Sequence, residues 1–408
     1  MRPLKAAQAE VLGALSTLPA ALVPLGDALG LVPATPVVAP HSVPPFTNSA
    51  MDGYAVRAED VTASPVNLTV LEDVPAGRVP SQRVVQGTAI KIMTGAPIPE
   101  GADAVVRVED TSQSGEVVTI NVGVPSGTSV RSAGGDVEAG TEVLQTGVRL
   151  TPAHIGVLAN LGIAQLAVHR RPRVALASTG DELVPVDGPA LGPGQIRDSN
   201  RPMLAAMLLE LGVHVVDLGR IPDDATALRS AIARGVEGAD VIVTSGGVSM
   251  GEYDLVKQVL GELGNIEFWQ VAMQPAKPFA FGKVGGKPLF GLPGNPVSSF
   301  VAFEQFVRPG LLKMMGARSL FRPQVQGRTK VKLATDPDKT VFVRVRTSTD
   351  GEVRWSEPSG GQSSNVLSAV IAGDAFAVVP EGVGAVEAGE PVTLEMFRWP
   401  EERTIDER

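Results

Sequence analysis

The sequence predicts a multidomain protein of mixed α+β and α/β class, organised around a central doubly wound α/β domain. Residues 172–318 alternate short apolar runs with amphipathic segments, which is typical of a parallel sheet covered by helices. Residues 66–130 and 320–398 instead carry short β-branched runs separated by glycine and proline, and these predict two small β-rich units. A chain of 408 residues is long enough for several such domains.

Composition excludes several classes of function. The net charge of −9 and the aromatic content of only 4% argue against a nucleic-acid or anionic-membrane partner. The absence of cysteine excludes disulfides, thiolate metal sites and cysteine nucleophiles, and the four histidines stand singly, which argues against a histidine metal cluster. No uninterrupted apolar run of about 18 residues and no signal peptide is present. We therefore expect a cytoplasmic protein without membrane contact.

The first part of the chain predicts two helices on either side of a β-rich insertion. An apolar stripe predicts a helix over residues 4–17, followed by an extended stretch rich in proline and valine. Thr151 and Pro152 have the residue types of an N-cap and a first helical residue, so they begin a second helix. We therefore expect a connector domain made of residues 1–45 and 140–171.

The insertion itself, residues 46–139, is expected to be a small all-β domain. Asp52 and Gly53 are typical of a hairpin turn, and Thr94 is the one hydroxyl of a second turn. An arginine and Asp136 flank two further glycines. The predicted strands of this domain are 66–71, 88–93, 104–108 and 116–122.

The α/β domain is expected at residues 172–318 and a C-terminal β-barrel at 319–399. Ligands of doubly wound sheets bind beyond the carboxyl ends of the strands, so the turns at those ends are candidate site residues. The predicted strands are 173–178, 213–218, 241–244 and 288–292, and the predicted helices are 201–211, 224–234, 252–263 and 296–308. In the tail, strands are predicted at 329–333, 341–346, 353–356, 376–379 and 392–397.

The turn after the third of these strands carries the strongest local signal. Ser245, Gly246 and Gly247 follow an apolar run directly, and adjacent glycines bring backbone N–H groups close to a ligand. A helix with Asp254 in its first turn comes next, which together suits an anion site with a divalent cation beside it. A tight turn with a capping acid fits the same residues equally well. The signature of ordinary P-loop enzymes is absent.

Three more polar turns follow predicted strands, so four turns converge on one edge of the sheet. Each acid in them is, taken alone, more often a helix cap than a catalyst. Lys277 lies between proline-containing segments, which suits a positioned charge. The four turns are 178–182, 221–224, 244–254 and 291–299, and the most polar loop of the tail is 358–365.

These segments resemble one family in both residues and order. Residues 48–56, 93–96, 178–183, 245–249 and 292–298 match the motifs of the molybdopterin molybdenumtransferases, that is, MoeA-like proteins and the E domain of gephyrin. The resemblance covers nearly the whole chain. It implies a central domain of the molybdopterin-binding type and a role in molybdenum cofactor biosynthesis.

The resemblance also implies a reaction. Such a transferase takes adenylylated molybdopterin and molybdate, places the metal on the dithiolene with Mg²⁺ present, and releases AMP. It implies a homodimer, and contacts with the molybdopterin adenylyltransferase and with acceptor molybdoenzymes. The matching catalytic positions are Asp52, Thr94, Asp136, Glu182, Asp223 and Asp254, of which Glu182, Asp223 and Asp254 would hold the metal ion. The matching substrate positions are Ser245, Gly246, Gly247, Ser249, Lys277, Pro293, Gly294, Asn295, Pro296, Ser298, Arg344 and Ser364.

One departure and two alternatives stay open. Gln274 stands where the family commonly has a lysine, so anion capture could be weaker unless Lys283 or Lys287 compensates. The adenylyltransferase of the preceding step shares the α/β domain, although it lacks residues 1–150 and 320–398. A gephyrin-like scaffold would need none of the acidic residues. Tungstate in place of molybdate fits the same pattern.

Overall fold

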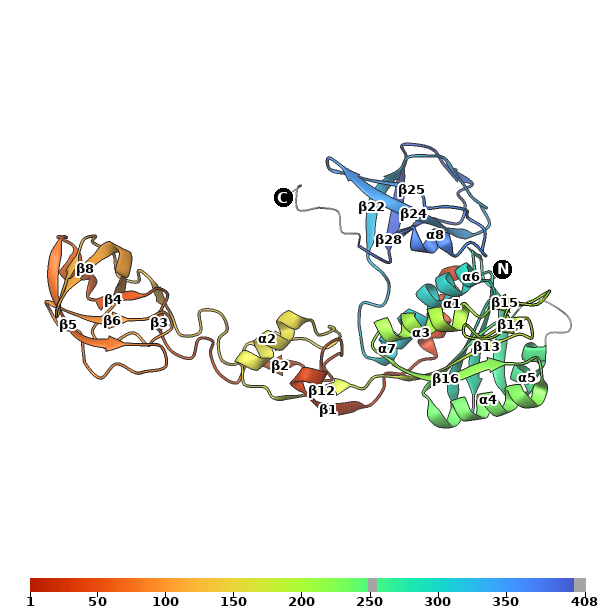
Figure 1. The fold of residues 1–408 in the computed structure, drawn as a ribbon, viewed down its shortest axis with the longest axis horizontal. Helices are drawn as coiled ribbons and strands as arrows, with labels where there is room; N and C mark the ends of the chain where they lie inside the picture. The colour runs from red at the N-terminus through yellow and green to blue at the C-terminus, as the bar shows by residue number, and fades with distance from the viewer. Residues whose placement is uncertain (249–254, 400–408) are drawn as a thin grey trace.

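The computed structural model describes residues 1–248 and 255–399, and it is elongated (Figure 1). A β-rich domain occupies one end, a narrow connector the middle, and the α/β domain lies with the C-terminal barrel at the other end. The predicted fold class is confirmed. Ser249 and Asp254, two of the predicted site residues, lie outside the described residues.

The inserted domain is a six-stranded sheet with a core on each face. The core on one side includes Tyr54, Leu68 and Ile120, all fully buried. The other face buries Ala55, Ile90 and others. In spatial order the strands are β7 (Ala104–Arg107), β4 (Gly53–Val56), β6 (Thr88–Ile92), β5 (Val66–Val74), β9 (Val117–Ile120) and β8 (Thr111–Ser114).

The predicted hairpin turn at Asp52 and Gly53 is wrong. Strand β3 (Asn48–Ser49) pairs with β10 (Val130–Arg131), whereas β4 pairs with β6 and β7. Gly53 is instead the first residue of a central strand. A Cβ there would lie 2.0 Å from the carbonyl oxygen of Val106, so the close approach of β7 requires glycine at this position.

The connector consists of two small antiparallel ladders and one helix. Strand β1 (Ala20–Pro24) pairs with β12 (Gln165–His169), and β2 (Val37–Val38) pairs with β11 (Glu142–Leu144). The helix α2 (Pro152–Asn160) begins with the predicted cap, where Thr151 and His154 form a capping box. A single 3-10 turn, η1 (Leu25–Asp27), follows β1.

The first helix, α1 (Leu4–Gly13), lies on the α/β domain rather than in the connector (Figure 1). Its buried side chains Leu4, Ala7 and Val11 join the same core as Leu311. The helix ends four residues earlier than its sequence pattern predicts, and Leu18 then donates its backbone N–H to Met314. Hydrophobic burial against helix α7 (Arg308–Met314) therefore decides where this segment packs.

The α/β domain is built on a six-stranded mixed sheet. Strands β16 (His214–Ile221), β13 (Arg173–Thr179), β17 (Val241–Ser245) and β21 (Lys287–Leu292) are parallel, in that spatial order, which confirms the doubly wound prediction. Strands β20 (Pro278–Val284) and β18 (Gly264–Gln270) complete the sheet in antiparallel pairings. The sequence analysis did not predict a strand over 264–270.

Helices cover both faces of this sheet (Figure 1). On one face lie α4 (Ala225–Gly238) and α5 (Leu255–Leu263), and on the other lie α3 (Asn200–Glu210), α6 and α7. The predicted helix at 296–308 is longer than expected. It runs through α6 (Pro296–Ala302), a π-helical segment η4 (Phe303–Val307) and α7 (Arg308–Met314).

The C-terminal domain is a closed barrel, as predicted. Its strands are β24 (Thr340–Asp350), β25 (Val353–Pro358), β22 (Gln324–Thr329), β28 (Pro391–Met396) and β26 (Ala375–Val379), and β26 pairs back with β24. The strand predicted at 329–333 lies earlier, because residues after Thr329 turn into the short β23 (Leu333–Ala334), which pairs with β27 (Ala385–Val386). Strand β19 (Met273–Gln274) of the α/β domain pairs in parallel with β24. Helix α8 (Ser368–Ile371) lies beside β24.

A buried polar chain joins α1, the π-helical segment and the barrel. Gln8 donates to the side chain of Gln305 at 3.0 Å, and Gln305 donates to Glu395 on β28 at 2.5 Å. Gln324 donates to the other carboxylate oxygen at 3.2 Å. Glu395 is only 4% exposed, so these amides replace its water.

We expect the stability of the protein to depend on pH through Glu395. Burial raises the pKa of this carboxyl, and Glu304 raises it further, against the amide donors and Arg308. Because the folded-state pKa exceeds the unfolded one, the contribution of this group is fully present at low pH and is lost as pH rises through the raised pKa.

Replacing Glu395 by glutamine removes that titration. The variant should therefore gain stability relative to the wild type with increasing pH, by about 1.4 kcal/mol for each unit of upward pKa shift. Urea unfolding from about pH 4 to about pH 8 measures the difference. A difference that does not change with pH would contradict the expected role of Glu395.

No helix within residues 1–248 and 255–399 is long and apolar enough to cross a bilayer.

Candidate active site

A cleft of about 1060 Å³ opens at the carboxyl ends of β13, β17 and β21. All four polar turns singled out in the sequence contribute to its lining. The predicted site residues among the lining are Glu182, Asp223, Ser245, Gly246, Gly247, Pro293, Gly294, Asn295, Pro296 and Ser298. The edge of a parallel sheet therefore gathers these segments, as expected for a doubly wound fold.

The two glycines of the central turn are required by the backbone. Gly246 and Gly247 have φ values of 99° and 67°, which side chains rarely adopt. A Cβ on Gly246 would lie 2.6 Å from the carbonyl oxygen of Thr179, and one on Gly247 would lie 2.2 Å from a methyl carbon of Val256. The close packing of β17 against β13 and α5 thus leaves no room for a side chain.

One expectation about this turn needs correction. The backbone N–H of Gly246 donates to the carbonyl oxygen of Leu292 at 3.0 Å, so it is used within the sheet edge. It is not the ligand donor that the sequence suggested. The N–H of Gly247 is left as the candidate donor of the pair.

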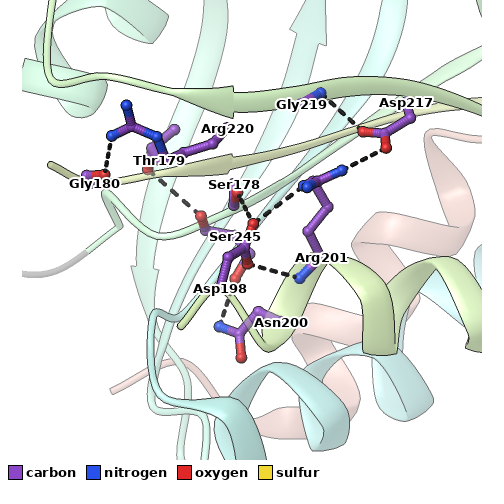
Figure 2. Close-up of polar contacts among 10 residues, drawn as sticks. All are labelled: Ser178, Thr179, Gly180, Asp198, Asn200, Arg201, Asp217, Gly219, Arg220 and Ser245. Carbon is purple, nitrogen blue, oxygen red and sulfur yellow. Dashed lines mark hydrogen bonds and ion pairs between the residues drawn. The ribbon is translucent and has the colours of Figure 1, made fainter. Parts of the chain in front are cut away.

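The base of the cleft is a network of hydrogen bonds around Ser245 (Figure 2). Asn200, the first residue of α3, donates from Nδ2 to the Ser245 hydroxyl at 2.8 Å and to the carbonyl oxygen of Gly294 at 2.7 Å. The Ser245 hydroxyl also lies 3.3 Å from that of Ser299, which donates to Pro293. The start of α3 therefore ties the turns after β17 and β21 together.

A second buried group beside it is Asp198, which the sequence analysis missed. Its side chain is 1% exposed and accepts from the Ser178 hydroxyl at 2.6 Å and from Arg201 Nε at 3.1 Å (Figure 2). Arg201 also pairs with Asp217. The only sequence signal was Asp-Ser-Asn directly before a helix, which alone predicts a cap. Here the carboxylate accepts the backbone N–H of Arg201 at 3.2 Å, as a cap would, and through Ser178 and the Arg201 side chain it also orders the rim of the cleft.

The structure separates capping acids from acids that face the cleft. Asp224 is the N-cap of α4 and accepts the backbone N–H of Ala227 at 2.7 Å. Asp223, one residue earlier, is exposed and lines the cleft together with the exposed Glu182. Two carboxylates at one cleft fit Mg²⁺, which is held by one or two carboxylates with substrate phosphate and water. The described residues contain no cluster of three or more such ligands.

The predicted oxyanion residues lie on two sides of the junction between the α/β domain and the barrel. Ser298 is 5% exposed and lines the cleft, and Lys277 is exposed next to Pro278, which also lines it. The carbonyl oxygen of Ser364 accepts the N–H of Val297, so the polar barrel loop contacts the start of α6. Ser298 and Ser364 therefore lie close together, and Lys277 lies beside the same cleft.

Arg344 lies at a second hollow, of about 410 Å³, which Gln274 and Lys332 also line. Its side chain is 2% exposed, and its NH2 group donates to Gly361 at 3.1 Å and to Ser363 at 3.2 Å. Nε has no hydrogen-bond partner among the described residues. Burial lowers the pKa of Arg344 to about 10, so the group is still charged at neutral pH.

The remaining predicted residues are far from the cleft within one chain. Asp52 and Thr94 belong to the inserted domain at the opposite end of the molecule (Figure 1). The Thr94 hydroxyl and backbone N–H each donate to Asp52 Oδ1 at 2.7 Å, and these bonds lower the pKa of Asp52. Asp136 is exposed in the loop that leaves this domain. The exposed Asp52 carboxylate is therefore held ionised and oriented.

Fold and cleft together define a multidomain α/β protein with a large cleft at the carboxyl edge of its central sheet, walled by glycines and rimmed by carboxylates. Family models for the MoeA N-terminal region (domain I and II), a probable molybdopterin binding domain and the MoeA C-terminal region (domain IV) match residues 2–162, 175–313 and 326–397. The chain belongs to the MoeA family of molybdopterin molybdenumtransferases, enzymes of molybdenum cofactor biosynthesis. The resemblance found in the sequence is confirmed.

Relatives support the same family over the full length. Molybdopterin molybdenumtransferase 2 of Mycobacterium tuberculosis is 42% identical over 377 residues, covering 90% of this chain and 92% of that protein. The Haemophilus influenzae transferase is 38% identical, covering 91% and 93%. Two structures of molybdopterin biosynthesis MoeA protein from Pyrococcus horikoshii share 35% and 28% identity with TM-scores of 0.79 and 0.83, and each covers at least 97% of both chains. The matches outside the α/β domain set the adenylyltransferase alternative aside.

Proposed function

We propose that this transferase acts on adenylylated molybdopterin: it transfers molybdate to the dithiolene and cleaves the adenylate, releasing AMP, with Mg²⁺ required. One observation carries the proposal. The cleft joins a glycine turn, buried amide and hydroxyl groups, and two exposed carboxylates at one sheet edge. A volume of about 1060 Å³ suits a ligand as large as a nucleotide-linked pterin.

The residues of the cleft have three different roles: they bind the substrate phosphates, keep the wall in shape and hold Mg²⁺. Gly247 N–H and the hydroxyl of Ser298 are donors for the substrate phosphates, while Ser245 and Asn200 hold the wall in shape. Glu182, Asp223 and Asp254 would hold Mg²⁺, and Ser249 would bind the substrate. Asp254 and Ser249 lie outside the described residues. Bound Mg²⁺ would neutralise the negative charge that develops as the phosphoanhydride is cleaved.

For molybdate, we propose Lys277, Ser298, Arg344 and Ser364 as the binding set. Lys277 supplies an exposed cation at the junction between the α/β domain and the barrel. The pKa of Asp336 is lowered mainly by its hydrogen bond from Lys339, and the charge of Lys277 makes a smaller contribution. The remaining cleft residues, Pro293 to Pro296, shape the floor. The absence of a lysine at Gln274 leaves Lys277 as the cation of this segment.

We also propose a homodimer in which each site is shared. Asp52, Thr94 and Asp136 lie on a separate arm and cannot reach the cleft of their own chain in this arrangement (Figure 1). The connector exposes Leu22, Val38 and Val157, apolar side chains that a second subunit would cover. Contacts with the adenylyltransferase and with acceptor molybdoenzymes, and a cytoplasmic location, stay predictions.

The test is an assay with adenylylated molybdopterin, molybdate and Mg²⁺. We expect AMP release together with formation of cofactor that activates a molybdoenzyme apoprotein. Adenylylation of molybdopterin from ATP would instead identify the enzyme of the preceding step, and no turnover would favour a scaffold. Tungstate in a parallel reaction reports the choice of oxyanion.

Replacing Lys277 by alanine should weaken molybdate binding. The loss of one charge-assisted hydrogen bond costs about 1.5–3 kcal/mol, which is about a 10- to 150-fold higher Kd. Titration calorimetry measures it. Lys283→Ala is the matched control, because Lys283 is an exposed lysine near the far end of β20, the strand that begins directly after Lys277. Equal affinities of the Lys277 variant and the wild type would remove Lys277 from the site.

A further inference from the structure

Four arginines gather where the connector, the α/β domain and the chain leading to the barrel meet. Arg149 precedes α2, Arg171 lies between β12 and β13, Arg308 begins α7 and Arg322 precedes β22. Their charges act on one another. Burial lowers the pKa of Arg149, and the charges of Arg171 and Arg322 lower it further. Burial also lowers the pKa of Arg308, and the charges of Arg322 and Arg149 add to this effect. We call these four residues the arginine junction.

Carboxylates balance only part of this charge. Glu304, 2% exposed, accepts from Arg322 at 2.8 and 3.0 Å and lies 3.8 Å from Arg308 Nε. Glu210 lies 3.9 Å from Arg322 and is largely exposed. Glu304 therefore serves two guanidinium groups at once, and Glu210 gives weak, solvent-screened compensation.

Glu395 is the third nearby carboxyl, so three carboxyl groups face the four guanidinium groups. Burial raises the pKa of Glu395, and its two oxygens already accept from Gln305 and Gln324. The arginine junction thus holds more guanidinium charge than carboxylate charge. Burying uncompensated charge is costly, so such an excess calls for a counter-ion.

Unused donors are present at the same place. Arg308 is 9% exposed, and its Nε has no hydrogen-bond partner among the described residues, although NH1 donates to Leu320 at 3.0 Å. The one hydrogen bond of Arg149 within the described part of the chain runs from Nε to Gly30 at 3.2 Å. Arg171, by contrast, uses NH1 and NH2 for the carbonyl oxygens of Gly212 and Leu29. Arg149 and Arg308 are therefore the groups with donors to offer.

We propose that the arginine junction binds a phosphate-type oxyanion, outside the catalytic cleft, through Arg149 and Arg308. Planar guanidinium groups recognise such oxygens in pairs of parallel hydrogen bonds. The anion would join residues of the connector to α7, and so brace the arm that carries the inserted domain against the α/β domain.

The test is hydrogen–deuterium exchange of the full chain in inorganic phosphate and in chloride at equal ionic strength. Backbone N–H groups at residues 29–31, 149–150 and 308–322 should exchange more slowly in phosphate, by the factor 1 + [phosphate]/Kd. Protection of residues 293–298 reports phosphate in the catalytic cleft separately. The junction is thereby distinguished from the cleft in one measurement.

Two variants and one control complete the design. Arg149→Gln should abolish the phosphate effect at the junction, and Arg149→Lys, which keeps the charge and the fold but not the paired donors, should weaken it. Arg229→Gln should retain it, because Arg229 lies on the outer helix α4 and pairs with Glu262. No protection of the junction by phosphate in the wild type, or equal protection in Arg149→Gln, would overturn the proposal.

Discussion

Gly246→Ala is expected to lower the rate of AMP release by at least about 100-fold, the size of effect that a displacement of about 1 Å in a site produces. The φ of 99° is strained for alanine, and its methyl group would lie 2.6 Å from the Thr179 carbonyl oxygen and 2.7 Å from the Thr179 hydroxyl. Relief requires β17 and β13 to move apart at their carboxyl ends. The cleft wall would move with them.

The matched control is Gly261→Ala on α5. A Cβ there meets no atom within 4 Å, and alanine favours a helix over glycine, so this variant should keep full activity. Single-turnover AMP release, with circular dichroism to verify folding, compares the two. Wild-type turnover by Gly246→Ala would show that the shape of this turn is unimportant.

The second large effect concerns a shared site. Homodimers of Asp52→Ala and of Asp223→Ala should each be inactive, because one removes the acid of the inserted domain and the other an acid of the cleft. If each site combines the inserted domain of one subunit with the cleft of its partner, mixed dimers contain one intact site. Half the dimers are mixed after exchange, so activity should return to about a quarter of the wild-type level.

A control pair tests the same exchange without complementation. Asp223→Ala and Glu182→Ala both alter the cleft, and no pairing of these two chains restores an intact one. This mixture should stay inactive. Failure of the Asp52 and Asp223 pair to recover, after exchange is verified by mass-tagged subunits, would place the complete site within one chain.

Local pattern predicted much of the fold because it reports which segments are buried. The parallel strands at 173–179 and 241–245 contain continuous apolar runs, at 174–177 and 241–243, and such runs are typical of strands covered on both faces. The Gly246–Gly247 turn could likewise be found from sequence. Two glycines directly after a buried strand indicate a backbone conformation that residues with a side chain rarely adopt. The cap at Thr151 was correct for the same local reason.

Errors arose where a distant segment decides the structure. Gly53 resembles a turn residue, but β7 packs against it and makes it part of a strand. The edge strand β18 has weak alternation, and it exists because β20 supplies its hydrogen bonds. Helix α1 packs on the α/β domain and not in the connector, because its apolar side chains are buried against α7.

By itself, the sequence determined the class of fold, the four polar turns and, through their order, the family. These depend on residue types that act over a few neighbouring positions. Only the tertiary structure decided that Asp198 and Asn200 are buried at the cleft, that the Gly246 N–H is already bonded, and that Asp52 lies at the other end of the molecule. Burial, hydrogen-bond partners and distance between domains are properties of segments far apart in the chain, and no local pattern encodes them.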